Sequence, residues 1–246
     1  MCKFPIELSA LLLVSTALIM GNPGLAQARQ IAVELELVLA VDTSASVDDA
    51  EYRLQMSGIA HSFRDRDVIA AIESFGGAGI AVAMIHWSAT AARVTSWSHI
   101  VDSSGSLNFA AQIEVIPRSS LGVTTGIGTA LALAQLEFAT NGFAGRRRSI
   151  DVSGDGKNNS GLPLWDQRTR ATSAGITING LAVLDQDPLL KRYYGNHVIG
   201  GNGAFVITAA NFRDFARAFR QKLLREIQAL VTRNKNHVPH RNFARR

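Results

Sequence analysis

The chain has 246 residues, 47% of them hydrophobic and 18% charged, and it contains a single cysteine. This length and hydrophobic content suit one α/β domain with a sizeable core, and they exclude a chain dominated by disorder. Basic residues exceed acidic residues by five, but the residues after Ala229 supply that excess without any Asp or Glu. A basic domain face for nucleic acid is therefore not expected.

The first 28 residues have the features of a secretory signal peptide. Lys3 precedes an apolar run at 8–20, and Ala26-Gln27-Ala28 supplies the small-x-small pattern that signal peptidases cleave. The run is shorter than the roughly 20 residues that a membrane-spanning helix needs. We therefore expect cleavage after Ala28 and a periplasmic or secreted bacterial protein without a transmembrane span in its mature form. An uncleaved N-terminal anchor is the alternative.

The only cysteine, Cys2, precedes the apolar run, so the mature protein should contain none. This excludes disulfides, thiolate nucleophiles and cysteine-type zinc sites together. A protein exported to an oxidising compartment would then depend on core packing for its stability.

The mature chain alternates predicted strands and helices. Strands are expected at 33–41, 80–87, 149–153, 176–184 and 204–208, with a short edge strand at 94–97. Helices are expected at 48–63, 107–116, 126–139, 165–174 and from Asn211 to Ile227. This alternation predicts one α/β domain at 29–229, with a doubly wound, mainly parallel central sheet flanked by helices. A basic, flexible tail at 230–246 follows it.

Side chains with oxygen donors follow two of the predicted strands and precede one helix. Asp42, Ser44 and Ser46 come directly after the first strand, and Asp155 comes directly after the strand at 149–153. Thr125 stands at the start of the helix at 126–139. Ligands of doubly wound sheets bind outside the carboxyl ends of the strands. The sequence therefore predicts that these donors meet at one edge of the sheet.

The pattern Asp-x-Ser-x-Ser, then a Thr before Gly-x-Ala-Leu, then Asp-Gly resembles the metal-ion-dependent adhesion site of von Willebrand factor type A domains. The resemblance extends from about Glu34 to Ile227. The segments Trp87-Ser88, 150–156 and 178–180 are similar to an exported bacterial branch of that family whose function is unknown. The expected fold is therefore the von Willebrand factor type A fold, which is Rossmann-like.

The resemblance also implies roles for the five residues. Ser44 and Ser46 would coordinate a cation directly, Thr125 would do so directly or through water, and Asp42 and Asp155 would hold coordinating waters. Oxygen ligands with retained waters suit Mg²⁺, with Mn²⁺ or Ca²⁺ as alternatives, and disfavour zinc and copper. In the family, the open coordination position accepts a carboxylate from a partner protein.

Two positions depart from the family pattern. Gly126 follows Thr125 where many relatives carry Asn, and Gly154 precedes Asp155 where many carry Thr. The coordinating residues are present, but these two glycines leave the affinity of the site open.

Each segment also has an ordinary structural interpretation. Ser46 with Asp49 is similar to a capping box, Thr125 is suited to cap a helix, and Asp155-Gly156 is suited to a turn. An EF-hand-like loop beginning at Asp151 is a weaker alternative, because Leu162 stands where the bidentate Glu is required.

The sequence contains no nucleophile elbow, no metalloprotease motif and no phosphate-binding glycine loop. His86 in an apolar strand is interpreted as a core residue, and His61 on the first helix similarly. The expected function is a non-enzymatic, exported binding module that recognises an acidic group on a protein partner through a bound cation. Its basic tail would add a weak attraction to anionic surfaces. A metal-independent structural or assembly domain is the second hypothesis, and an undetected hydrolase is the third.

Overall fold

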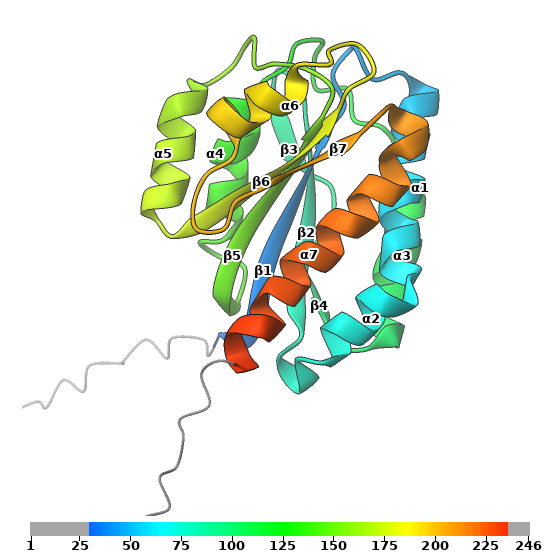
Figure 1. Ribbon diagram of the computed structural model, residues 1–246, viewed down its shortest axis with the longest axis vertical. Coiled ribbons are helices and arrows are strands. Elements are labelled where there is room, and N and C mark those ends of the chain that lie inside the picture. Colours follow the sequence, from blue (N-terminus) through cyan, green and yellow to red (C-terminus); the bar gives the residue numbers. More distant parts are fainter. Residues whose placement is uncertain (1–29, 236–246) are drawn as a thin grey trace, which may run out of the picture.

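The computed structural model describes residues 30–235, with side chains through Gln228 (Figure 1). The predicted signal peptide and residues 236–246 of the predicted tail lie outside this range. Within it, no helix combines the length and hydrophobicity needed to cross a membrane.

Within residues 30–235, a single seven-stranded sheet forms the centre of the fold (Figure 1). Its strands are β1 (Ile31–Asp42), β2 (Ile80–Trp87), β3 (Ala91–Arg93), β4 (Ser98–Ile100), β5 (Phe143–Gly154), β6 (Ile176–Val183) and β7 (Val206–Ala209). The order is β3-β2-β1-β5-β6-β7, with β4 also paired to β2. The strands β2, β1, β5, β6 and β7 run parallel, and β3 and β4 run antiparallel to β2. The predicted fold class is confirmed.

Helices cover both faces of the sheet. They are α1 (Asp49–Arg64), α2 (Arg66–Glu73), α3 (Ser103–Glu114), α4 (Ile127–Glu137), α5 (Leu164–Ser173), α6 (Leu190–Tyr193) and α7 (Phe215–Lys235). Short helical turns also occur at Gly76–Ala78, Tyr194–Val198 and Phe212–Asp214. Figure 1 shows α1, α2, α3 and α7 on one side of the sheet and α4, α5 and α6 on the other.

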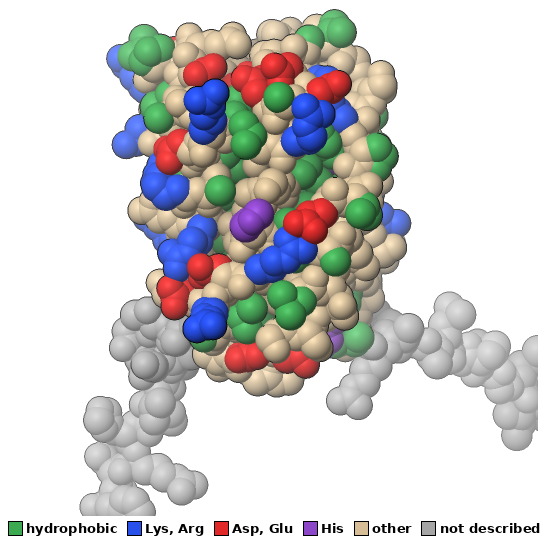
Figure 2. All heavy atoms as spheres, turned by 90° about the vertical axis from the view of Figure 1, so that its right-hand side faces the viewer, with side chains coloured by type: hydrophobic (Ala, Val, Ile, Leu, Met, Phe, Trp, Pro, Cys, Tyr) green, Lys and Arg blue, Asp and Glu red, His purple; other side chains and the backbone are tan. Residues whose placement is uncertain are grey.

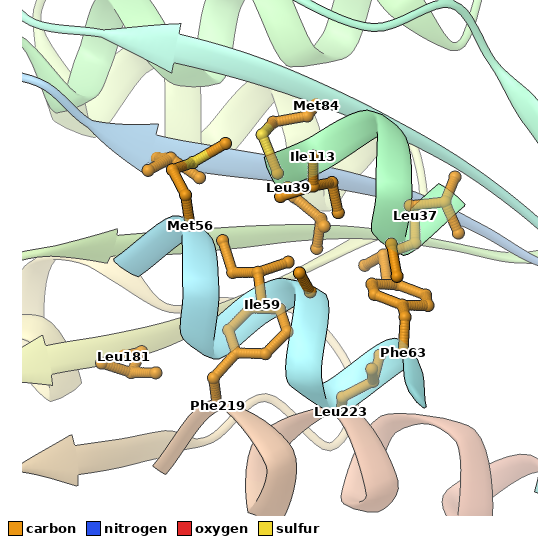
Figure 3. Packing of buried hydrophobic residues seen from close by; sticks show 14 of the residues in the cluster. Leu37, Leu39, Met56, Ile59, Phe63, Met84, Ile113, Leu181, Phe219 and Leu223 are labelled. Carbon is orange, nitrogen blue, oxygen red and sulfur yellow. The ribbon is translucent and has the colours of Figure 1, made fainter. Parts of the chain in front are cut away.

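The central strand β1 supplies both halves of the core because its side chains alternate between the two faces. Leu37 and Leu39 face the side of α1, α3 and α7, where Ile59 and Phe219 pack (Figure 3). Val38 belongs to the other cluster, beneath α4 and α5. Such burial on both faces explains why β1 is continuously apolar from Leu37 to Val41.

The outer surface of α1, α2, α3 and α7 carries acidic and basic side chains next to one another (Figure 2). Arg220 on α7 pairs with Asp65 at 2.7 Å, and Arg64 on α1 pairs with Glu114. These exposed pairs contribute little stability individually. They neutralise the charge of this face locally.

The prediction of an edge strand at 94–97 is wrong, because that segment lies between the two short strands β3 and β4. Val94 still donates its backbone N–H to Met84, but the hydroxyl of Thr95 accepts the Met84 N–H at 2.8 Å. A side chain thus takes the place of a backbone carbonyl and interrupts the edge strand there.

Other elements also differ from the sequence prediction. Helix α2 was not expected, although Asp65 caps it by accepting the N–H groups of Asp67 and Val68. Strand β5 begins at Phe143, six residues earlier than expected. Helix α7 continues to Lys235, through the first residues assigned to the tail.

Candidate metal centre

The carboxyl ends of β1 and β5 lie side by side, because Val41 pairs with Ser153 in the parallel register. The loops after these two strands are joined by side chains. Ser46 Oγ donates to Asp155 Oδ1 at 2.7 Å, and the hydroxyl oxygens of Ser44 and Ser46 are 3.2 Å apart. The pattern after β1 and the carboxylate after β5 therefore meet as predicted.

Thr125 reaches the same edge from the loop before α4. Its backbone N–H donates to Asn159 Oδ1 at 2.8 Å, and Asn159 N–H returns a bond to the Thr125 carbonyl at 2.9 Å. A β-carbon on Gly156 would lie 3.2 Å from Thr125 Oγ1, so the Thr125 hydroxyl lies against the turn that follows Asp155. The structure thus gathers all five predicted residues at one edge of the sheet.

Two asparagines that the sequence analysis did not select hold this arrangement. Asn159 fixes Thr125, and Asn158 Oδ1 accepts the Gly128 N–H at 3.0 Å, which fixes the first turn of α4. Their place three and four residues after Asp155 was the available signal, because side-chain amides commonly tie loops to neighbouring backbone.

The capping interpretations of Ser46 and Thr125 are wrong. Asp48 is the N-cap of α1, and it forms a full capping box with Glu51. The N-cap of α4 is Gly126, which has no side chain to contribute. The hydroxyls of Ser46 and Thr125 are therefore free of helix capping.

Asp42 is a fully buried carboxylate. Its Oδ1 accepts the Ser44 N–H at 2.8 Å, whereas Oδ2 has no hydrogen-bond partner within residues 30–235. Burial raises the pKa of Asp42 to about 7, and the nearby Asp155 adds to the rise. Burial also raises the pKa of Asp155. Two carboxylates that resist ionisation next to each other form a site that a cation would stabilise.

The donor set fits a hard cation. Two carboxylates and three hydroxyls supply only oxygen, and Ser46 is exposed while the other four side chains are buried. Across residues 30–235, no three His, Cys, Asp or Glu side chains cluster as metal ligands. The site therefore contains fewer charged ligands than a carboxylate cage, and oxygen-only ligation with retained water is typical of Mg²⁺.

A pocket of about 430 Å³ adjoins these residues. Arg118, which the sequence analysis also did not select, forms part of its wall. Its guanidinium donates to the carbonyls of Thr43 and Ser44 at 3.1 and 3.0 Å and pairs with Asp49 at 3.0 Å. The backbone carbonyls at the start of the candidate metal loop thus accept hydrogen bonds from a positively charged arginine side chain beside the pocket.

Gly154 and Gly126, the two residues that depart from the von Willebrand factor type A pattern, each have a steric reason to be glycine. A β-carbon at Gly154 would lie 2.7 Å from Asp42 Oδ2 and 2.9 Å from the Tyr194 hydroxyl. A β-carbon at Gly126 would lie 2.5 Å from the carbonyl oxygen of Ser88, which also accepts the Gly126 N–H at 2.9 Å. Larger residues would displace these groups from their present positions.

His86 is buried beside the pocket, as expected for a core residue. Its Nδ1 lies 2.8 Å from Ser119 Oγ, and burial lowers the pKa of His86 to about 4. The similar expectation for His61 is wrong. That side chain is exposed on α1 and forms a 2.7 Å hydrogen bond with the carbonyl of Ser57, one turn earlier.

Solved structures similar to this chain have von Willebrand factor type A domains. Proximal thread matrix protein 1 from the mussel byssus is 15% identical, with a TM-score of 0.59. That match covers 82% of this chain, which spans about half (48%) of the mussel protein. A second structure of the mussel protein, described as having a zinc-occupied MIDAS motif, is 15% identical with a TM-score of 0.57, covering 82% of this chain and 49% of that one.

The von Willebrand factor domain of the type V pili tip protein Mfa5 from Porphyromonas gingivalis is 12% identical, with a TM-score of 0.53. This match covers 80% of this chain and 97% of the Mfa5 domain. Residues 32–231 match a family described as "Protein of unknown function (DUF1194)". No protein with a curated description matches the sequence. At these identities, the structural matches establish the fold.

Proposed function

This chain belongs to the DUF1194 family of proteins of unknown function, and we propose that it is an exported binding module that holds a divalent cation and, through it, an acidic group on a protein partner. The buried Asp42 carboxylate carries this proposal. Its Oδ2 has no partner within the described residues, although the hydroxyls of Ser44 and Ser46 lie on the same short loop. A buried carboxylate without a counter-charge is costly, and a cation would relieve that cost.

The proposed cation is Mg²⁺, with Mn²⁺ and Ca²⁺ as alternatives. Ser44, Ser46 and Thr125 would supply hydroxyl oxygens, and Asp42 and Asp155 would supply the negative charge and orient bound water. The bound cation would supply a Lewis-acidic position for an oxygen ligand. The mussel relative with a zinc-occupied motif makes zinc a necessary comparison in any binding experiment.

The pocket beside the site supports a partner with an acidic group. Arg118 lies in its wall, and its side chain is 29% exposed. A carboxylate that approaches the cation would therefore also approach a basic side chain. Hydrogen bonds from a charged Arg to a carboxylate are a common recognition mode. Relatives described as a pilus tip protein and a byssus matrix protein are compatible with a role in protein assembly.

The test is partner capture that depends on the metal site. The mature chain from Arg29 is immobilised and exposed to envelope proteins of the source bacterium in Mg²⁺ or in EDTA. We expect a defined protein to be retained in Mg²⁺, released by EDTA, and lost with Ser46→Ala. The matched control is Ser173→Ala, an exposed serine at the end of α5. Retention of the same partner in EDTA and by Ser46→Ala would instead support a metal-independent assembly domain.

A further inference from the structure

A second polar cluster lies inside the domain, between α7 and the sheet. It consists of Ser149 and Asp151 on β5, Asn179 on β6, and Lys222 and Glu226 on α7. All five side chains are at most 3% exposed. None of them belongs to the candidate metal centre. A fully buried lysine beside two buried carboxylates is rare in globular proteins. This cluster therefore calls for a physical explanation of its own.

The contacts place the lysine between the two acids. Lys222 Nζ forms an ion pair with Asp151 Oδ1 and lies 3.8 Å from Glu226 Oε1. The Oε1 atom of Glu226 is held by two donors, Ser149 Oγ at 3.1 Å and Asn179 Nδ2. Glu226 is thus fixed in position by neighbours other than Lys222, with its carboxylate next to the amine.

The surroundings of the pair are apolar. Leu39, Leu181 and Phe219, which are labelled in Figure 3, line the same space, and it has no room for a water molecule. Within residues 30–235, neither oxygen of Asp151 makes a hydrogen bond, and Lys222 Nζ makes none beyond its ion pairs. A buried ion pair without further hydrogen bonds retains most of its desolvation cost. An amide between the two groups would remove both charges.

We propose that Lys222 and Asp151 become joined by an intramolecular isopeptide bond, with Glu226 as the proton carrier. A proton first passes from the Lys222 ammonium to the Asp151 carboxylate, which leaves a neutral amine and a carboxylic acid. The lone pair of Nζ then attacks Cγ of Asp151. Glu226 accepts a proton from Nζ and delivers it to the departing hydroxyl as the Cγ–O bond breaks. The products are one amide and one water, and no oxidant or other reactant is needed.

Burial also favours the reactive form of the amine. It lowers the pKa of Lys222 to about 8, so an appreciable fraction of the side chain is uncharged near neutral pH. The bond would tie β5, which carries Asp155 beyond its end, to the closing helix α7. The chain has no cysteine after Cys2 from which a disulfide could be made. A lysine–aspartate link would constrain the unfolded chain in the way that a disulfide does.

Intact-mass spectrometry of the purified chain tests the proposal. The wild type should be lighter than its sequence mass by one water, and trypsin should release a branched peptide that joins 149–157 to 221–225. Glu226→Gln, which preserves the shape of the side chain, should have its full sequence mass and no branched peptide. Lys157→Met, which removes an exposed, ion-paired lysine instead, should retain the loss of water.

A variant at the acid provides a second readout. Asp151→Asn should release ammonia in place of water and reach the same final mass as the cross-linked wild type. Wild-type protein at its full sequence mass, without the branched peptide, would overturn the proposal whether or not the variants fold. The cluster would then be a buried ion pair.

Discussion

Replacement of Asp42 by Asn should stabilise the protein when no divalent cation is present. Asn can keep the hydrogen bond from the Ser44 N–H while it removes the buried charge. The pKa of Asp42 rises from 3.8 to about 7 in the folded state. Each pKa unit corresponds to about 1.4 kcal/mol, so the charge costs roughly 4 kcal/mol above that pH. Asp42→Asn should recover much of this free energy.

The sign of the pH dependence follows from the raised pKa. Between pH 3.8 and about 7 the folded state retains a proton that the unfolded state releases. The contribution of Asp42 to the free energy of unfolding of the wild type therefore decreases as the pH rises from 3.8 to about 7. In EDTA, Asp42→Asn and the wild type should have similar free energies of unfolding near the acidic end of this pH range. The variant should be more stable than the wild type above about pH 7.

Denaturant unfolding in EDTA, at acidic and at mildly alkaline pH, measures this difference. Millimolar Mg²⁺ should then stabilise the wild type by mass action and leave the variant unchanged. Asp166→Asn, at an exposed position in the first turn of α5, is the matched control and should respond to Mg²⁺ like the wild type. A variant that is less stable than the wild type in EDTA at alkaline pH would refute the reasoning.

Three further predictions concern other parts of the chain. Because burial lowers the pKa of His86 to about 4, stability should fall as the pH drops from 6.5 through that value, by roughly 3 kcal/mol. His86→Gln should remove this part of the acid sensitivity in equilibrium unfolding at several pH values. Gly154→Ala should cost about 1 to 3 kcal/mol in the same assay, because the new methyl group meets Asp42 and Tyr194; an unchanged midpoint would contradict the steric account. Expression in a bacterial host should yield a mature N-terminus at Arg29 by mass spectrometry, whereas intact Met1 in membrane extracts would favour an anchor.

The strands at the centre of the fold could be predicted because burial on both faces leaves a clear apolar pattern. The segments of β1, β2 and β6 show it in the sequence. The start of β5 could not be predicted in this way, because Arg146, Arg147 and Arg148 resemble a solvated corner. In the structure, Arg146 lies within β5 with its side chain 64% exposed, and it pairs with Glu34 on the neighbouring strand β1 at 3.3 Å.

The five site residues could be predicted from the sequence because they follow or precede regular elements in a fixed order. The residues that surround them in the structure could not be predicted. Arg118 precedes no recognisable motif, and it acts on the site only because the loop after α3 returns to the end of β1. Lys222 and Glu226 are one helical turn apart on α7, which is typical of an exposed pair. Only the packing of α7 on β5 places them inside the domain.

Titration calorimetry of Mg²⁺ binding to the purified mature chain tests the central claim most directly. The wild type should bind one Mg²⁺ with measurable affinity at millimolar ion, and Asp42→Ala, still folded, should bind none, because it removes one of the two charged groups at the site. A parallel titration with Zn²⁺ separates a hard-cation site from one that prefers zinc. Equal Mg²⁺ affinity in the wild type and Asp42→Ala, or no binding by the wild type, would contradict the proposal and favour a metal-independent role.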